Sequence, residues 1–176
     1  MTTTATRTDA LGAELRADTK AGAEMVATAE WLAAEFTDGA LAHDRDASFA
    51  TEHLERLRDG GFLYAPVPSE LGGGGVRSVH DVLVAMSRLA RGDASTTIGV
   101  NMHFAVLLNV VRRWRMANAV GDAKAADALQ GLLLMVTAAK VVFATAVSEP
   151  APSWRTPCGR RSASRRRPAA PSSSAG

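Results

Sequence analysis

The chain has 176 residues, of which 47% are hydrophobic and 22% charged, the size and composition of one soluble globular domain. Its single cysteine, Cys158, excludes an internal disulfide and any multi-cysteine metal site. The net charge of +2 hides an asymmetry, because six of the 20 basic residues and none of the 18 acidic ones lie in the last 22 positions. The excess of positive charge therefore belongs to this tail, and only the tail could offer a basic surface to nucleic acid.

The first half of the chain reads as helices. Residues 1–8 are expected to be a disordered start, and residues 9–46 to be helical, with Gly22 and Gly39 leaving open whether this is one helix or two. A shorter helix is predicted over 50–59, with Leu54 and Leu57 facing inward and Gly60-Gly61 ending it. One apolar face of the first segment is marked by residues spaced three or four apart: Met25, Ala29, Leu32 and Phe36.

A loop with two prolines and four consecutive glycines follows, over residues 62–75. Ser78, three residues before Asp81, predicts the N-cap of a helix that ends near Gly92. The residues expected to face inward on it are Val82, Leu83, Met86, Leu89 and Ala90.

Asp93 or Ser95 is predicted to cap a long helix that is apolar almost all round and therefore buried among other helices. A further helix is predicted over 123–139. Residues 141–147, VVFATAV, then read as one β-strand, and SEP as a turn.

The predicted fold is therefore all-α: a bundle of five or six helices over 9–140, then one strand and a turn over 141–150, and a disordered Arg/Pro/Ser-rich tail over 151–176. A lone strand is incomplete, because its backbone groups need partner strands. The start of the chain has no apolar core of the kind a signal peptide needs. The longest apolar run falls short of the roughly 20 residues of a membrane helix. We expect a cytoplasmic protein with no membrane span.

No complete active site is visible from chemistry alone. The four histidines are scattered without metal-ligand spacing, so no metal site is expected, and His103 is interpreted as a core histidine with its hydrogen bonds satisfied. The glycine run at 72–75 lacks the context of a phosphate loop and is interpreted as a flexible connector. The tail motif RRSASRRR could bind an anionic partner, but it lacks the interleaved aromatic residues of specific single-strand binders.

Five short motifs in order nevertheless carry a family likeness, over about 27–150. They are the helix end HDR, the turn GGF, the loop VPSELGG, the helix end LAR and the helix start DAS. This order resembles the N-terminal half of acyl-CoA dehydrogenases, and VVFATAVSEP is similar to that family's strand and turn leading into a β domain.

The resemblance implies FAD as cofactor, acyl-CoA as substrate and a homo-oligomer in the parent enzyme. Its implied flavin contacts are Val147 and Ser148, with Thr145 beside them. Four residues of the long helix are candidate liners of the acyl chamber, with ordinary helix packing as the equal alternative: Ile98, Asn101, Met102 and Ala105.

The sequence departs from the family pattern from Ala151 onward, where a glycine-rich turn is expected. The sequence therefore predicts an N-terminal fragment that lacks the catalytic base and most of the flavin site and is inactive alone. We interpret the tail either as the product of a frameshift in the gene or as an authentic basic segment. Two alternatives stay open: a helical interaction module whose tail binds an anionic partner, and a fragment of a related flavin-dependent monooxygenase.

Overall fold

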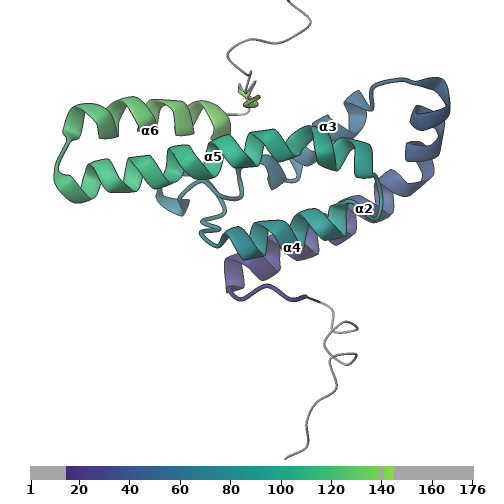
Figure 1. The fold of residues 1–176 in the computed structure, drawn as a ribbon, viewed down its shortest axis with the longest axis horizontal. Coiled ribbons are helices and arrows are strands. Elements are labelled where there is room, and N and C mark those ends of the chain that lie inside the picture. Colours follow the sequence, from purple (N-terminus) through teal and green to yellow (C-terminus); the bar gives the residue numbers. More distant parts are fainter. Residues whose placement is uncertain (1–14, 139–140, 145–176) are drawn as a thin grey trace, which may run out of the picture. The chain divides into compact units, whose positions relative to one another are not determined.

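The computed structural model describes residues 15–138 and 141–144, and the regular secondary structure among them is helical (Figure 1). The all-α prediction is confirmed for them. In chain order the elements are α2 (Lys20–Asp46), α3 (Thr51–Asp59), the short 3-10 helices η1 (Phe62–Tyr64) and η2 (Ser69–Leu71), α4 (Val79–Leu89), α5 (Ala94–Val120) and α6 (Ala123–Thr137).

The structure describes the first four residues of the predicted strand, and they do not form a strand. Residues 141–144 have no regular secondary structure, and no other described segment offers them a partner strand. The rest of that strand, the turn up to residue 150, the start at 1–8 and the tail at 151–176 lie outside the described residues.

Helix α2 is one continuous helix with both Gly22 and Gly39 inside it. It begins at Lys20, so the prediction of helix for residues 15–19 is wrong: Thr19 is the N-cap, and its hydroxyl accepts a hydrogen bond from the Gly22 N–H at 3.0 Å. The predicted apolar face is confirmed, because its members are all buried: Met25, Ala29, Leu32 and Phe36.

Helices α2 and α4 lie side by side and are joined at the start of α2 by a buried carboxylate (Figure 1). Asp81 accepts hydrogen bonds from the Thr19 hydroxyl at 2.5 Å and from the Asp18 N–H at 2.8 Å. A Cβ on Gly22 would come within 2.0 Å of this carboxylate, so only glycine leaves room for it. The sequence predicts Asp81 only as an acidic residue in the first turn of α4. In the structure its side chain also joins α4 to the start of α2.

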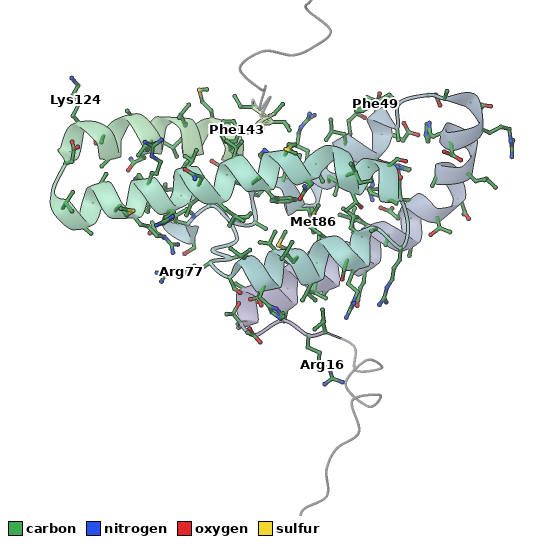
Figure 2. The ribbon with its side chains drawn as sticks, in the orientation of Figure 1. Arg16, Phe49, Arg77, Met86, Lys124 and Phe143 are labelled. Atoms are coloured by element: carbon green, nitrogen blue, oxygen red, sulfur yellow. The ribbon has the colours of Figure 1, made fainter. Side chains whose placement is uncertain are left out.

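Helix α4 follows the predicted boundaries, with the Ser78 hydroxyl accepting from the Asp81 N–H at 3.2 Å. Leu83, predicted to face inward, is exposed, while Val84 and Ala85 are buried instead. The apolar stripe of α4 is therefore rotated from the predicted one, because both α2 and α5 pack against this helix. Met86 points toward α5, whereas Lys124 at the start of α6 points away from the helices (Figure 2).

The glycine run between η2 and α4, interpreted from the sequence as a flexible connector, is held in place by backbone hydrogen bonds. The Gly75 N–H donates to the Val67 carbonyl at 2.8 Å, and the Val76 N–H donates to the Ala65 carbonyl at 2.9 Å. These two bonds fold the loop back on itself and bring Val76 into the core.

Helix α5 joins the two halves of the core. Val100 and Phe104 pack in the cluster formed with α2, α3 and α4, while Leu107 and Val111 pack with Leu133 and other residues in a second cluster against α6. By length and composition alone α5 could cross a membrane, but one such helix is weak evidence, because core helices of soluble proteins can be as long and as apolar.

Candidate functional site

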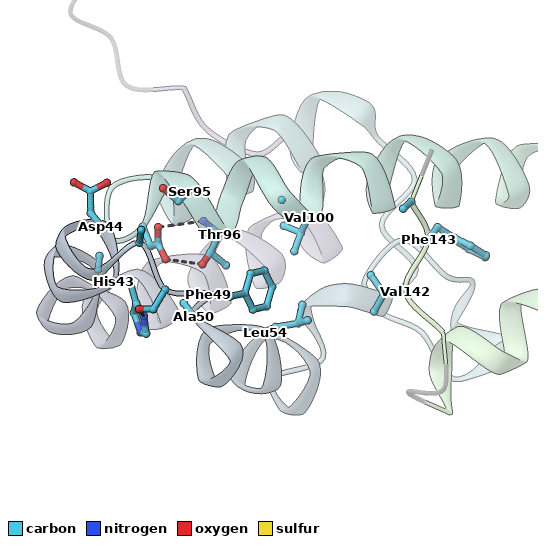
Figure 3. Close-up of a pocket in the computed structure, with 16 residues that line it drawn as sticks. His43, Asp44, Phe49, Ala50, Leu54, Ser95, Thr96, Val100, Val142 and Phe143 are labelled. Atoms are coloured by element: carbon cyan, nitrogen blue, oxygen red, sulfur yellow. Dashed lines mark hydrogen bonds between the residues drawn. The ribbon is translucent and has the colours of Figure 1, made fainter. Parts of the chain in front are cut away.

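A cavity of about 530 Å³ lies at the end of α2, between the α2–α3 loop, the start of α5 and residues 142–144 (Figure 3). Much of its wall is apolar: Phe49, Ala50, Leu54, Val100, Val142 and Phe143. Polar side chains gather where α2 ends and α5 begins: His43, Ser48, Asp93, Ser95 and Thr96. An apolar pocket with a few convergent polar groups is the usual form of a small-molecule site.

Asp93 organises the polar end of the cavity, next to Ser95 and Thr96. Of the two predicted caps of α5 it is the one observed: its carboxylate accepts from the Thr96 N–H at 3.1 Å and the Thr96 hydroxyl at 2.5 Å. It also lies 2.8 Å from His53 Nδ1. Burial acts to raise the pKa of Asp93, but the hydrogen bonds from Thr96 and His53 outweigh it and hold that pKa below its usual value.

Next to this carboxylate, three side chains converge from α2 and α3. His53 stacks on Phe36 with ring centroids 4.0 Å apart, and His43 meets the edge of the His53 ring at 5.5 Å. His43 also contacts Ser48 through Nδ1 at 2.8 Å and Glu52 through Nε2 at 2.5 Å. A backbone hydrogen bond and then the contact with His43 lower the pKa of Glu52.

His103 ties residues 141–144 to the core. Its Nδ1 accepts from the Phe143 N–H at 3.0 Å, its Nε2 donates to the Leu63 carbonyl at 2.7 Å, and its ring stacks on Phe143. Burial lowers the pKa of His103, partly offset by the bond to Leu63, so the ring is neutral. The interpretation as a satisfied core histidine is confirmed. Its hydrogen bond to Phe143 could not be predicted, because the two residues lie 40 positions apart in the sequence.

The four predicted chamber liners share one face of α5, but they do not line this cavity. Ile98 is 73% exposed and Met102 45% exposed, and Asn101 and Ala105 are exposed beside them. The face of α5 toward the cavity carries Ser95, Thr96, Gly99 and Val100 instead. Because the helix is apolar almost all round, its sequence has no periodicity that marks which face meets the cavity.

The predicted flavin contacts Thr145, Val147 and Ser148 lie outside the described residues. The cavity borders the segment that leads to them, at Val142, Phe143 and Ala144. Within the described part of the chain this wall is mainly apolar and does not by itself form a set of donors for a flavin ring.

The model of the family "Acyl-CoA dehydrogenase, N-terminal domain" matches residues 20–115, from the first residue of α2 to the last turns of α5. The chain belongs to the acyl-CoA dehydrogenase family. Its five sequence motifs and its helical N-terminal domain are features of that family, so the resemblance stated from the sequence is confirmed.

The relatives of this acyl-CoA dehydrogenase family member fall into two kinds. It is 40% identical over 76 residues to a putative acyl-CoA dehydrogenase, YdbM, of Bacillus subtilis. It is 40% identical over 73 residues to the amino sugar nitrososynthase DnmZ of Streptomyces peucetius, and 33% identical over 106 residues to L-evernosamine nitrososynthase of a Micromonospora species. These stretches cover 43%, 42% and 60% of the chain, respectively.

A solved structure of KijD3 in complex with dTDP is similar in fold, with a TM-score of 0.64 and 34% identity over 71% of this chain. The chain spans only 20% of YdbM, 18% of DnmZ, 25% of L-evernosamine nitrososynthase and 31% of KijD3. It therefore corresponds to a minor part of each relative.

Proposed function

We propose that this chain forms the substrate-side wall of a flavin-dependent oxidoreductase that desaturates acyl-CoA thioesters. The observation that carries the proposal is the position of the cavity: its apolar wall ends at residues 142–144, directly before the predicted flavin contacts at Thr145, Val147 and Ser148. A substrate in this cavity would lie next to the segment that the family resemblance assigns to the cofactor.

The shape of the wall suits an acyl chain. Leu54, Val100 and Phe143 supply apolar surface from three parts of the chain, and each methylene group transferred from water to such a surface contributes about 0.8 kcal/mol. Ser95 and Thr96 offer hydroxyl groups at the first turn of α5 for a polar part of the ligand. The cavity would thus bind and orient the substrate.

FAD is the cofactor that family membership suggests. The described residues that line the cavity supply no donor set for it, and the resemblance assigns the base for the α-proton to a later domain of such enzymes. We therefore propose that the chain contacts substrate without turning it over, and that homo-oligomer contacts also belong to the whole enzyme.

A second candidate is oxidation of the nitrogen of a nucleotide-linked amino sugar. Three nitrososynthases match the chain, and the solved relative KijD3 holds dTDP. The two candidates differ in the ligand that the cavity should take: a fatty acyl thioester in the first, and a thymidine nucleotide in the second.

Gly99 allows a test that does not disturb the core. It lines the cavity, and a Cβ added there meets nothing within 4 Å, so Gly99→Leu should enter the cavity without a clash. Gly131 in α6 also has open space and lies away from the cavity, so Gly131→Leu is the matched control.

We expect saturation-transfer NMR to detect octanoyl-CoA on the full chain, and the signal of its acyl protons to be lost in Gly99→Leu but kept in Gly131→Leu. A signal from dTDP with the same dependence on Gly99, and none from octanoyl-CoA, would favour the amino-sugar candidate. Equal signals in both variants would contradict the cavity as a substrate site.

A further inference from the structure

We propose that His43, Glu52 and His53 form a binding site for a divalent transition-metal ion of the zinc class. One ligand atom from each of the three side chains lies within 4.8 Å of the others. Two imidazoles and one carboxylate are a ligand set that zinc uses in proteins, with the fourth position left to water or another ligand. The three residues come from the last turns of α2 and the first turn of α3.

In each of the two histidine rings, Nδ1 lies within hydrogen-bond distance of an acceptor, as the nitrogen opposite the metal usually does in metal-binding histidines. His53 Nδ1 contacts the Asp93 carboxylate at 2.8 Å, and His43 Nδ1 contacts the Ser48 hydroxyl at 2.8 Å. In the tautomers that carry the proton on Nδ1, both rings donate these bonds and Nε2 can bind an ion. For His43, the proton that lies between Nε2 and the Glu52 carboxylate would be released when the ion binds. Asp93 is buried, and its carboxylate also accepts hydrogen bonds from the Thr96 N–H and hydroxyl, so its position is fixed where it orients His53.

The packing brings the two rings together at Gly39. A Cβ on this residue would lie 3.3 Å from His53 Nε2 and 4.0 Å from His43 Cδ2, so the nitrogen of one ring and the edge of the other face the same point on α2. Phe36 stacks on one face of the His53 ring and so fixes the plane of that ring. The rings are therefore oriented before any ion binds.

The exposure of the three side chains gives the ion a path from solvent. The His53 side chain is 6% exposed, the His43 side chain 22% and the Glu52 side chain 58%. His53 would form the floor of the site and Glu52 its outer wall. Metal–ligand distances of about 2.0–2.2 Å require the three ligand atoms to move closer together. The exposed Glu52 side chain can move most easily.

The second histidine cluster among the described residues lacks these features and serves as an internal control. Asp18, His80 and Asp81 also place ligand atoms close together, but the Asp81 carboxylate accepts hydrogen bonds from the start of α2. His80 Nε2 is occupied by the Arg16 carbonyl at 2.9 Å. Asp81 and His80 therefore already take part in hydrogen bonds within the folded chain.

The test is a zinc titration of the untagged full chain in competition with a chromogenic chelator, in a Cys158→Ser background that removes the thiol. We expect one Zn²⁺ per chain and a rise in melting temperature with Zn²⁺, because an ion that binds only the folded state stabilises it. His43→Gln and Glu52→Gln should each weaken binding by about tenfold or more, and His80→Gln should not.

Both ligand substitutions are on the exposed side of the site, so the variants should fold, and circular dichroism checks that they do. The proposal is overturned if no stoichiometric zinc binds, or if His80→Gln weakens binding as much as His43→Gln. Because the readout is metal affinity, the result is independent of the acyl thioester experiment at Gly99.

Discussion

The imidazole of His103 has a pKa below that of a free histidine side chain. It is fully buried in α5, and both ring nitrogens are used, one by the Leu63 carbonyl and one by the Phe143 N–H. Because burial lowers its pKa, the folded chain holds the ring neutral at a pH where the unfolded chain protonates it. The contribution of this residue to stability is complete above a pH of about 6.5 and is lost as the pH falls from there toward the folded pKa.

His103→Gln should remove this dependence. We expect the variant to lose about 1–3 kcal/mol of unfolding free energy at neutral pH, because buried partners are left unpaired. Its stability should then fall less than that of the parent chain between neutral pH and a pH of about 5. Urea unfolding at the two pH values measures both effects, with His80→Gln as a control on an exposed ring. An unchanged pH slope in His103→Gln would contradict the account.

At the scale of elements, local signals in the sequence were enough for some boundaries and not for others. Ser78 and Asp93 could be predicted as caps because a cap depends on groups within three residues. The exposure of Leu83 could not, since it depends on where α2 and α5 pack. For the same reason, the sequence could not predict which face of α5 borders the cavity, or that His43, Glu52 and His53 meet across two helices. The four chamber liners stay a prediction.

The joint between α2 and α4 depends on the charge of Asp81. Asp81→Asn keeps the shape but weakens the bonds from Thr19 and Asp18, and we expect a loss of about 1.5–3 kcal/mol of unfolding free energy. Burial acts to raise the pKa of Asp81, but these bonds outweigh it and lower that pKa. The stabilisation should therefore be complete above a pH of about 3.9 and be lost as the pH falls through the folded value.

Chemical denaturation of Asp81→Asn at neutral pH, beside Asp127→Asn on the exposed side of α6, measures this loss. A loss in Asp81→Asn no larger than in Asp127→Asn would show that the carboxylate does not join the helices.

Helix α6 carries a glycine with no structural reason to be one. Gly131 is exposed, lies within the helix and would gain an unhindered Cβ. Gly131→Ala should raise the free energy of unfolding by up to about 1 kcal/mol, the difference in helix propensity. Thermal unfolding measures it, and a decrease in stability would indicate that this face of α6 packs against something in the folded chain.

At the scale of the whole molecule, α5 and α6 expose several large apolar side chains: Ile98, Met102, Met116, Val120, Leu134 and Met135. In a family whose members extend well beyond this domain, such surface is where other domains or subunits would pack. We expect the chain alone to associate with itself. Sedimentation should show less association in the variant Ile98→Lys/Met102→Lys than in Leu83→Lys, which changes an exposed position on α4. Equal association in both would place the contact elsewhere.

The measurement that tests the central claim most directly is the flavin content of the purified full chain, read from its visible absorbance after incubation with FAD and removal of the free cofactor. The account predicts a colourless protein, because the family resemblance assigns most of the flavin site to domains other than the helical one. A chain that retains one FAD per molecule would contradict it and would show that this sequence holds a complete cofactor site.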